Sequence, residues 1–276
     1  MFKRTTVPPD RITDRWSRGS RPTWRWSAMS QYKELYMKVT RLIKCIKSFG
    51  FCLFLAAHSL AFAERSPSEA AVPVEHASFH QLVFADADIA ILNNFFPPKG
   101  DSGFHTHYRD LFAVVIQPSQ TSGQGLGKPL TAAPMNPAGA AFYSAVGAEP
   151  RTHKVVNGDK SAYQIIVVEL RRSKPLGNAV SSRDAASQYV QIFDNPRMRA
   201  WRLVLAPGQS APSISQVNKG VRVVVRGGLL TTITSGLQDQ QLALRPGDFA
   251  VQPVGATRAL KNGGTETIEL VEIELK

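Results

Sequence analysis

Cysteine is nearly absent from this 276-residue chain, and its two cysteines, Cys45 and Cys52, both lie within the first 63 residues. The remainder can form neither disulfides nor thiolate–metal bonds, so any metal ion has to be bound by histidine, carboxylate or water. The sequence also lacks a Gly-x-Ser-x-Gly elbow, a Gly-Lys-Ser/Thr phosphate loop and a Gly-x-Gly-x-x-Gly motif. These absences exclude the usual serine-hydrolase, nucleotide-phosphate and dinucleotide sites.

Acidic residues are scarce only in the N-terminal part, although the whole chain carries a formal net charge of +12. Residues 1–63 contain 12 of the 33 Lys and Arg but 3 of the 21 Asp and Glu. The rest is nearly balanced and has no run of Lys and Arg interleaved with aromatic residues. Nucleic acid is therefore not an expected partner.

Residues 1–63 have the features of a leader with a secretory signal peptide. Four basic residues follow Met37, an apolar stretch runs from Phe49 to Phe62, and Ala63 completes a small-x-small cleavage site. The apolar stretch is shorter than the ~20 residues of a membrane span. We expect translation to start at Met29 or Met37, membrane contact only through the cleaved signal, and a periplasmic or secreted mature protein. An uncleaved anchor is the alternative.

From His80 onward, short apolar segments alternate with Gly, Pro, Asn and Asp, which predicts an all-β fold. Asn157-Gly158 and Asn262-Gly263 each lie between apolar runs and predict β-hairpins. The Gly- and Ser-rich stretch from Gln117 to Pro137 predicts a long loop. Helical patterning is confined to the stretch around Arg183 to Gln188.

The same region contains two copies of one pattern. His153–Gly158 aligns with Arg258–Gly263, and the match continues without a gap to Leu170 and Leu275. Closed barrels leave no edge strand exposed, so each copy is expected to form one. We predict an N-terminal barrel at residues 76–172, a linker at 173–187 and a C-terminal barrel at 188–276.

Five histidines follow the leader, and three of them suggest a metal site. His105 and His107 are two residues apart at the start of a predicted strand, so their imidazoles point to the same side. His153 begins a later predicted strand that can lie opposite the first. The three imidazoles can converge on one divalent transition metal ion, and iron, manganese, nickel, zinc and copper all suit such ligands. His76 and His80 are expected to be surface or strand-edge residues.

These motifs resemble those of the cupin superfamily. Gly100 with His105-Thr106-His107 resembles its first motif, and Gly147 to Asn157 resembles its second. The resemblance implies two small cupin-type β-barrels (jelly rolls) in tandem, with His105, His107 and His153 as metal ligands. The family's glutamate after the second histidine is missing, so Asp110 is the nearby candidate carboxylate ligand.

Other candidate site residues follow from position. Tyr108 and Arg109 are predicted to lie at the rim and orient a ligand, and Phe112 and Phe142 to line the barrel and exclude water. In the second copy, our alignment places Ser213, Ser215 and Arg258 at the three histidine positions, so that barrel is not expected to bind a metal. Its Arg258 is a candidate for pairing with an anionic ligand, together with Arg202, Arg222 and Arg226.

These residues favour an exported metal-binding protein whose partner is a small oxygen-rich organic molecule. Such a protein would be a metal-dependent oxygenase or isomerase. The alternative is a non-catalytic ligand-binding or structural protein of the cell envelope, which the missing glutamate favours. A homo-oligomer is compatible with either interpretation, and the fold alone does not choose the reaction.

Overall fold

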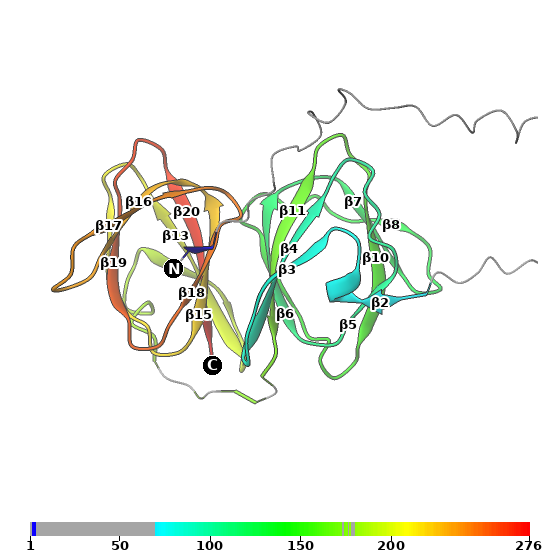
Figure 1. Cartoon of the computed structure of the whole chain (residues 1–276), viewed down its shortest axis with the longest axis horizontal. Coiled ribbons are helices and arrows are strands. Elements are labelled where there is room, and N and C mark those ends of the chain that lie inside the picture. The colour runs from blue at the N-terminus through cyan, green and yellow to red at the C-terminus, as the bar shows by residue number, and fades with distance from the viewer. Residues whose placement is uncertain (1, 4–69, 173, 176, 178–179) are drawn as a thin grey trace, which may run out of the picture. The chain divides into compact units, whose positions relative to one another are not determined.

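The computed structural model describes residues 2–3, 70–172, 174–175, 177 and 180–276, and the predicted signal sequence and both start sites lie outside them. Their regular secondary structure is almost entirely β-strand (Figure 1), with one short 3-10 helix, η2 (Val74–His76). Within this part of the chain no helix is long and apolar enough to cross a membrane.

The first barrel consists of two sheets. The order in one sheet is β2 (Val72–Pro73), β5 (His105–His107), β10 (Arg151–Asn157), β7 (Thr121–Gly125) and β8 (Thr131–Ala132). The order in the other is β3 (His80–Ala85), β4 (Ile89–Phe96), β11 (Tyr163–Leu170), β6 (Leu111–Gln117) and β9 (Ala141–Ser144). All neighbours are antiparallel except β2 and β5.

The second barrel repeats this strand order. One sheet contains β12 (Tyr189–Asp194), β13 (Met198–Leu205), β20 (Ile268–Leu275), β15 (Gly220–Arg226) and β18 (Phe249–Gln252), with β1 (Phe2–Lys3) paired to β18. The other contains β14 (Ser210–Ser215), β19 (Thr257–Asn262), β16 (Gly228–Ile233) and β17 (Gln240–Leu244). The predicted all-β fold with two tandem barrels is confirmed.

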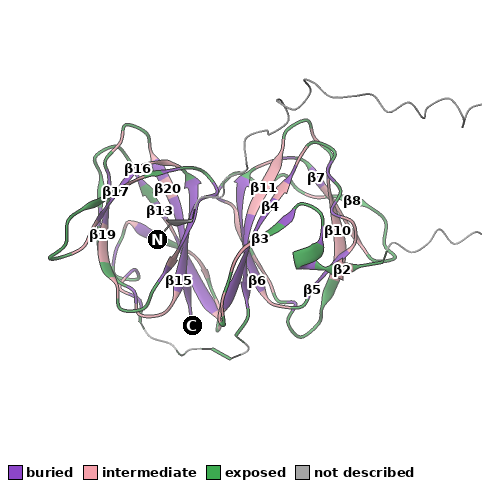
Figure 2. Cartoon of the chain, viewed as in Figure 1, coloured by how far each residue is buried: buried purple, intermediate pink, exposed green. Residues whose placement is uncertain are grey.

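The two barrels pack face to face through the sheets that contain β11 and β20, and the strands that meet there are among the most buried (Figure 2). Val271, Ile273 and Leu275 of β20 belong to the same hydrophobic cluster as residues of the first barrel. Phe112 belongs to this interface core and contacts Phe193 with ring centroids 5.5 Å apart, so the prediction that it lines the first barrel is wrong. Each fully buried aliphatic or aromatic side chain contributes about 1.5–3 kcal/mol, which explains why the barrels form one compact unit.

The predicted hairpins at Asn157 and Asn262 are wrong, because each turn joins strands of different sheets. The buried Asn157 amide nitrogen donates to the carbonyls of Phe96, Pro97 and Ser161 at 3.2, 3.1 and 2.8 Å. These bonds fasten the corner where the chain crosses from β10 to β11. An Asn-Gly pair signals a tight turn, but the apolar faces of the flanking strands decide which sheet each strand joins.

Two further local predictions are wrong. The Gly-rich stretch from Gln117 to Pro137 contains β7, which pairs with β10 over five residue pairs. Its backbone supplies the hydrogen bonds, so few large side chains are needed there. Residues 182–185 form turns instead of a helix, and the amide of Ala186 donates to the carbonyl of Arg183 at 3.0 Å.

Candidate metal centre

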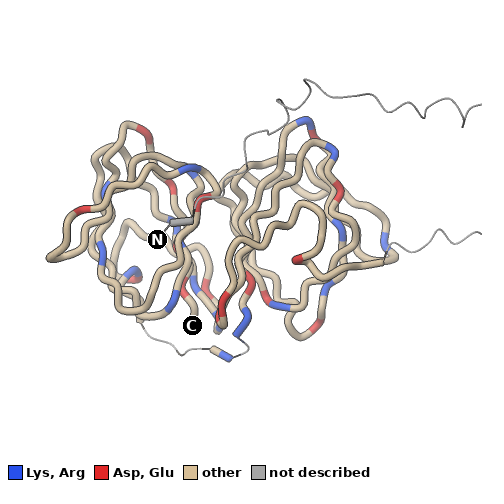
Figure 3. Tube along the Cα trace, in the orientation of Figure 1, with Lys and Arg blue, Asp and Glu red and all other residues tan. Residues whose placement is uncertain are grey.

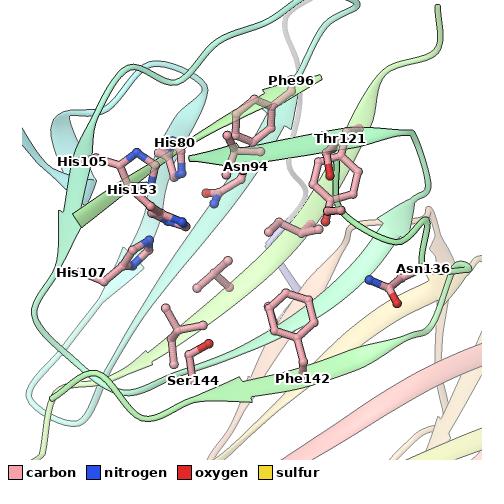
Figure 4. A pocket seen from close by; sticks show the side chains of 18 of the residues that line it. His80, Asn94, Phe96, His105, His107, Thr121, Asn136, Phe142, Ser144 and His153 are labelled. Carbon is pink, nitrogen blue, oxygen red and sulfur yellow. The ribbon is translucent and has the colours of Figure 1, made fainter. Parts of the chain in front are cut away.

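The three predicted histidines converge inside the first barrel. His105 and His107 point to the same side of β5, and His153 on β10 is the cross-strand partner of His105. One ring nitrogen from each residue lies within 4.8 Å of the others, and the ring centroids are 4.6–5.2 Å apart. Figure 4 shows them gathered at one end of a cavity.

The polar atoms of these rings fit a bound cation. His105 Nδ1 lies 3.1 Å from the carbonyl oxygen of Gly103, which can only accept, so Nδ1 carries the proton and Nε2 keeps a free lone pair. Gly103 has a φ of 64°, a conformation that glycine adopts without strain. The Nε2 atoms of His105 and His153 are buried without a hydrogen-bond partner. Buried polar atoms are rarely left unpaired, so this arrangement suits a metal ion.

Two of these imidazoles are kept neutral by their surroundings. Burial, together with the neighbouring histidines, lowers the pKa of His105 to about 3 and that of His153 to about 2. A metal ligand must offer an unprotonated nitrogen, so the metal would not have to compete with protons near neutral pH.

These pKa values predict that the metal-free protein loses stability in mild acid. Folded pKa values below the ordinary 6.5 mean that the unfolded chain binds more protons, so stability is full above pH 6.5 and falls as the pH drops below it. Each such imidazole lowers the free energy of unfolding by at most about 1.4 kcal/mol for each pH unit below 6.5. Urea unfolding of chelator-treated protein at pH 7.5 and pH 5 measures this. The exposed His76, replaced by Gln, is the control and should leave the slope unchanged.

His80 was expected at the surface, but it is buried beside the triad, and that prediction is wrong. Its ring centroid lies 4.4 Å from that of His105, and burial lowers its pKa to about 4. Its Nδ1 donates to the carbonyl of Ser78 at 2.8 Å, so Nε2 is the acceptor. Its only sequence signal is its position where the region of short apolar segments begins.

Glu169 is a functional candidate that the sequence analysis missed. This residue of β11 is 3% exposed, and its Oε1 lies 3.6 Å from His107 Nδ1. Neither atom has a hydrogen-bond partner. Its Oε2 lies 3.8 Å from the guanidinium of Arg109. Glu169 therefore supplies the negative charge beside the triad that the first motif lacks.

Asp110 has other partners. Its oxygens accept from the Tyr143 hydroxyl at 2.7 Å, the Gly147 amide at 2.8 Å and the Arg197 guanidinium at 2.8 Å. These bonds join the second barrel to the loop before His153, and they give its predicted role as a ligand no support. Tyr108 is 52% exposed and does not line the cavity.

The triad opens into a cavity of about 240 Å³. Phe142 lies across the cavity from the histidines (Figure 4). Arg151 is two residues before His153 and also lines the cavity. The remaining wall is mostly apolar and includes Phe96, Leu111, Ala113, Val146, Val155, Tyr163, Ile165 and Val167. Polar side chains also line it: Asn94, Ser119, Thr121, Ser122, Asn136 and Ser144.

The second barrel carries no histidine, and our alignment of its first motif was off by one residue. Arg258 pairs across the strands with Ile214, as His153 does with His105. The hydroxyl contact between Ser215 and Thr257 at 3.0 Å matches that between Thr106 and Thr152 at 2.9 Å. Gly208 matches Lys99 and not Gly100, because both have a positive φ and the amide of each donates to the carbonyl of the corner asparagine at 3.0 Å. Ile214 and Gln216 therefore occupy the positions of His105 and His107.

The arginines expected to assist Arg258 do not form one group. Arg222 is buried and donates to Glu272, whereas a bulge between Val224 and Arg226 leaves Arg226 exposed. Arg202 donates to the carbonyl of Gly139 in the first barrel at 2.7 Å. The predicted anion site therefore does not form from these residues.

Comparison with solved structures shows similarity to AerE from Microcystis aeruginosa, with a TM-score of 0.51 and 11% identity over 72% of this chain and 98% of that one. A salicylate 1,2-dioxygenase from Pseudaminobacter salicylatoxidans matches with a TM-score of 0.48 and 14% identity over 68% and 71% of the two chains. A cupin 2 conserved barrel domain protein from Leptotrichia buccalis matches with 0.45 and 12% over 71% and 88%. No protein-family model and no curated protein matches the sequence.

At these identities the similarity concerns the fold alone. The duplicated strand order agrees with it, and the chain shares with AerE a fold that here consists of two β-barrels in tandem. Only the first copy carries a histidine cluster among the described residues.

Proposed function

We propose that the protein is an exported metalloprotein whose first barrel binds a small organic anion beside a divalent transition metal ion. The observation that carries this proposal is the histidine triad, in which one ring nitrogen from each residue lies within 4.8 Å of the others and the Nε2 atoms of His105 and His153 have no hydrogen-bond partner. Iron, manganese, nickel, zinc and copper remain candidates, since neutral imidazoles suit all of them. Export rests on the signal-like leader sequence.

His105, His107 and His153 would hold the metal, and Glu169 would orient His107 by accepting from its Nδ1–H. Carboxylates behind metal-binding imidazoles fix the tautomer and the ring direction in this way. When bound, the metal would supply Lewis acidity to an oxygen of the ligand. The aromatic and aliphatic wall would exclude water from that oxygen, as expected for an oxygenase or isomerase site.

The charge of the site favours an anionic ligand. Arg151 lines the cavity, and no ion pair to it is present among the described residues, whereas Arg109 lies near Glu169. A carboxylate suits a guanidinium because two parallel hydrogen bonds can form. The mostly apolar wall suits an aromatic ring or a short hydrocarbon chain. The ligand would therefore carry its oxygen atoms at one end of the molecule.

Metal analysis and a matched pair of probes test this proposal. The untagged mature protein should carry near one equivalent of a single transition metal, measured by elemental mass spectrometry. By calorimetry, benzoate should bind the metal-loaded protein at least about tenfold more tightly than neutral benzamide, since one charge-assisted pair contributes about 1.5–3 kcal/mol. Arg151→Met should abolish this preference. A protein that takes up no metal even after reconstitution would favour the non-catalytic envelope protein.

A further inference from the structure

The segment that leads into each barrel is also duplicated. In the first barrel the amide of Ala77 donates to the carbonyl of Val74 at 3.2 Å, and in the second the amide of Ala186 donates to that of Arg183 at 3.0 Å. Each pair lies the same number of residues before the first long strand of its barrel, which is β3 or β12. Val74 and Arg183 are therefore equivalent positions.

The surroundings of these two positions differ in chemistry. Val74 is buried against Leu92, Ala113 and Val167. The strand registers place Trp201, Arg222 and Glu272 at those positions in the second barrel. An apolar contact in the first barrel is thus replaced by a charged and aromatic one.

The Arg183 side chain is buried and has partners on several sides. It is 3% exposed, Nη1 donates to Glu274 Oε2 at 2.9 Å, and Nη2 donates to Gln216 Oε1 at 2.8 Å and Glu272 Oε2 at 3.2 Å. The guanidinium carbon also lies 5.7 Å from the centroid of the Tyr189 ring and 5.4 Å from that of Trp201, within cation–π range. Gln216 occupies the position of His107, so Arg183 reaches the counterpart of the metal centre.

The strand residues leave an acceptor pair that matches a guanidinium. Oε1 of Glu272 accepts from Arg222, and Oε1 of Glu274 accepts from Arg199 at 3.0 Å. Arg183 donates to the Oε2 atoms of both glutamates, and Glu274 Oε2 also accepts from Gln216 Nε2 at 3.2 Å. Two carboxylate oxygens, an amide oxygen and two aromatic rings form a cage for a planar, positively charged fork.

We propose that the second barrel is a guanidinium-binding site whose resident ligand is Arg183 of the chain's own linker. The linker is fastened on both sides of this residue. Ser182 Oγ donates to the carbonyl of Ser215 at 3.2 Å, and Asp184 accepts from Trp201 Nε1 at 3.2 Å. The barrel without histidines thus has a site for an organic cation at the position that corresponds to the metal centre.

The test removes the resident side chain and supplies a free one. Arg183→Ala in the full chain should lower the melting temperature, because it leaves two carboxylates incompletely paired in a buried site. Millimolar ethylguanidinium should then raise the melting temperature of this variant saturably and leave the wild type unchanged, since only the variant has a vacant site. Ethylammonium lacks the planar guanidinium group and ethylurea lacks the positive charge. Neither should therefore raise the melting temperature of the variant.

Arg172→Ala is the matched control, since the Arg172 side chain is 47% exposed and pairs with Asp88 at the surface. Its melting temperature should not respond to ethylguanidinium. A folded Arg183→Ala protein without a saturable response would overturn the proposal. If the variant is recovered unfolded, an unchanged refolding yield with ethylguanidinium would count equally against it. In wild-type protein, nitrogen NMR should show slower hydrogen exchange at the Arg183 guanidinium than at Arg172, and equal rates would contradict the assignment.

Discussion

Replacing His105 and His153 together by alanine should reduce the bound metal from near one equivalent to less than about a tenth. A structural metal site of four ligands is worth about 10–16 kcal/mol, so the loss of two ligands weakens binding by several orders of magnitude. The two residues are direct cross-strand partners in β5 and β10, and both offer an unpaired Nε2. Elemental mass spectrometry before and after reconstitution measures the effect.

The control is His76→Ala, because His76 is exposed and lies outside the cluster. It should retain the metal content of the wild type. Circular dichroism should show the same β-sheet signal for all three proteins, since the triad nitrogens make few hydrogen bonds within the protein. Full retention of metal by the double variant would show that the metal is bound elsewhere.

The fold and the triad could be predicted because their signals are local. A strand has a side-chain period of two, so His105 and His107 had to share a face, and the second motif placed His153 at the start of a strand. The repeat showed that the architecture is duplicated. Only the convergence of His153 with the other two histidines depended on which strands are neighbours, and the resemblance of the two motifs supplied that information.

The missed features depend on strand neighbours and register. Glu169 lies far along the chain from His107 and comes near it only because β11 lies between β4 and β6. One signal was present, since Glu169 is the sole charged residue of an otherwise largely apolar central strand. The alignment of the histidine positions was off by one residue because the residue with positive φ that matches Gly208 is Lys99, and a non-glycine residue at such a position gives no signal in the sequence.

The duplicated strand also shows how the two barrels diverged. Glu169 and Glu274 are equivalent positions at the ends of β11 and β20. In the first barrel the carboxylate lies beside an imidazole, and in the second it accepts from Arg183 and Arg199. The equivalent buried glutamate thus lies beside a histidine cluster in one copy and pairs with a guanidinium in the other. Figure 3 shows that charges of both signs are spread over both barrels.

Glu169→Gln should weaken metal binding by about 10–100-fold, the usual effect of removing a carboxylate behind a metal-binding imidazole. Glutamine keeps the shape of the side chain but loses the charge that favours a proton on His107 Nδ1. Competition with a fluorescent chelator measures the change in affinity. Glu149→Gln is the matched control, because Glu149 is exposed and close in sequence to His153.

Nitrogen NMR of metal-free protein separates an orienting role from a purely structural one. In the wild type the His107 ring should carry its proton on Nδ1, and Glu169→Gln should reduce the population of that tautomer. Unchanged affinity and an unchanged tautomer would mean that Glu169 only pairs with Arg109, whose guanidinium lies 3.8 Å away. The three imidazoles would then bind the metal without a carboxylate partner, and their orientation would depend on strand geometry alone.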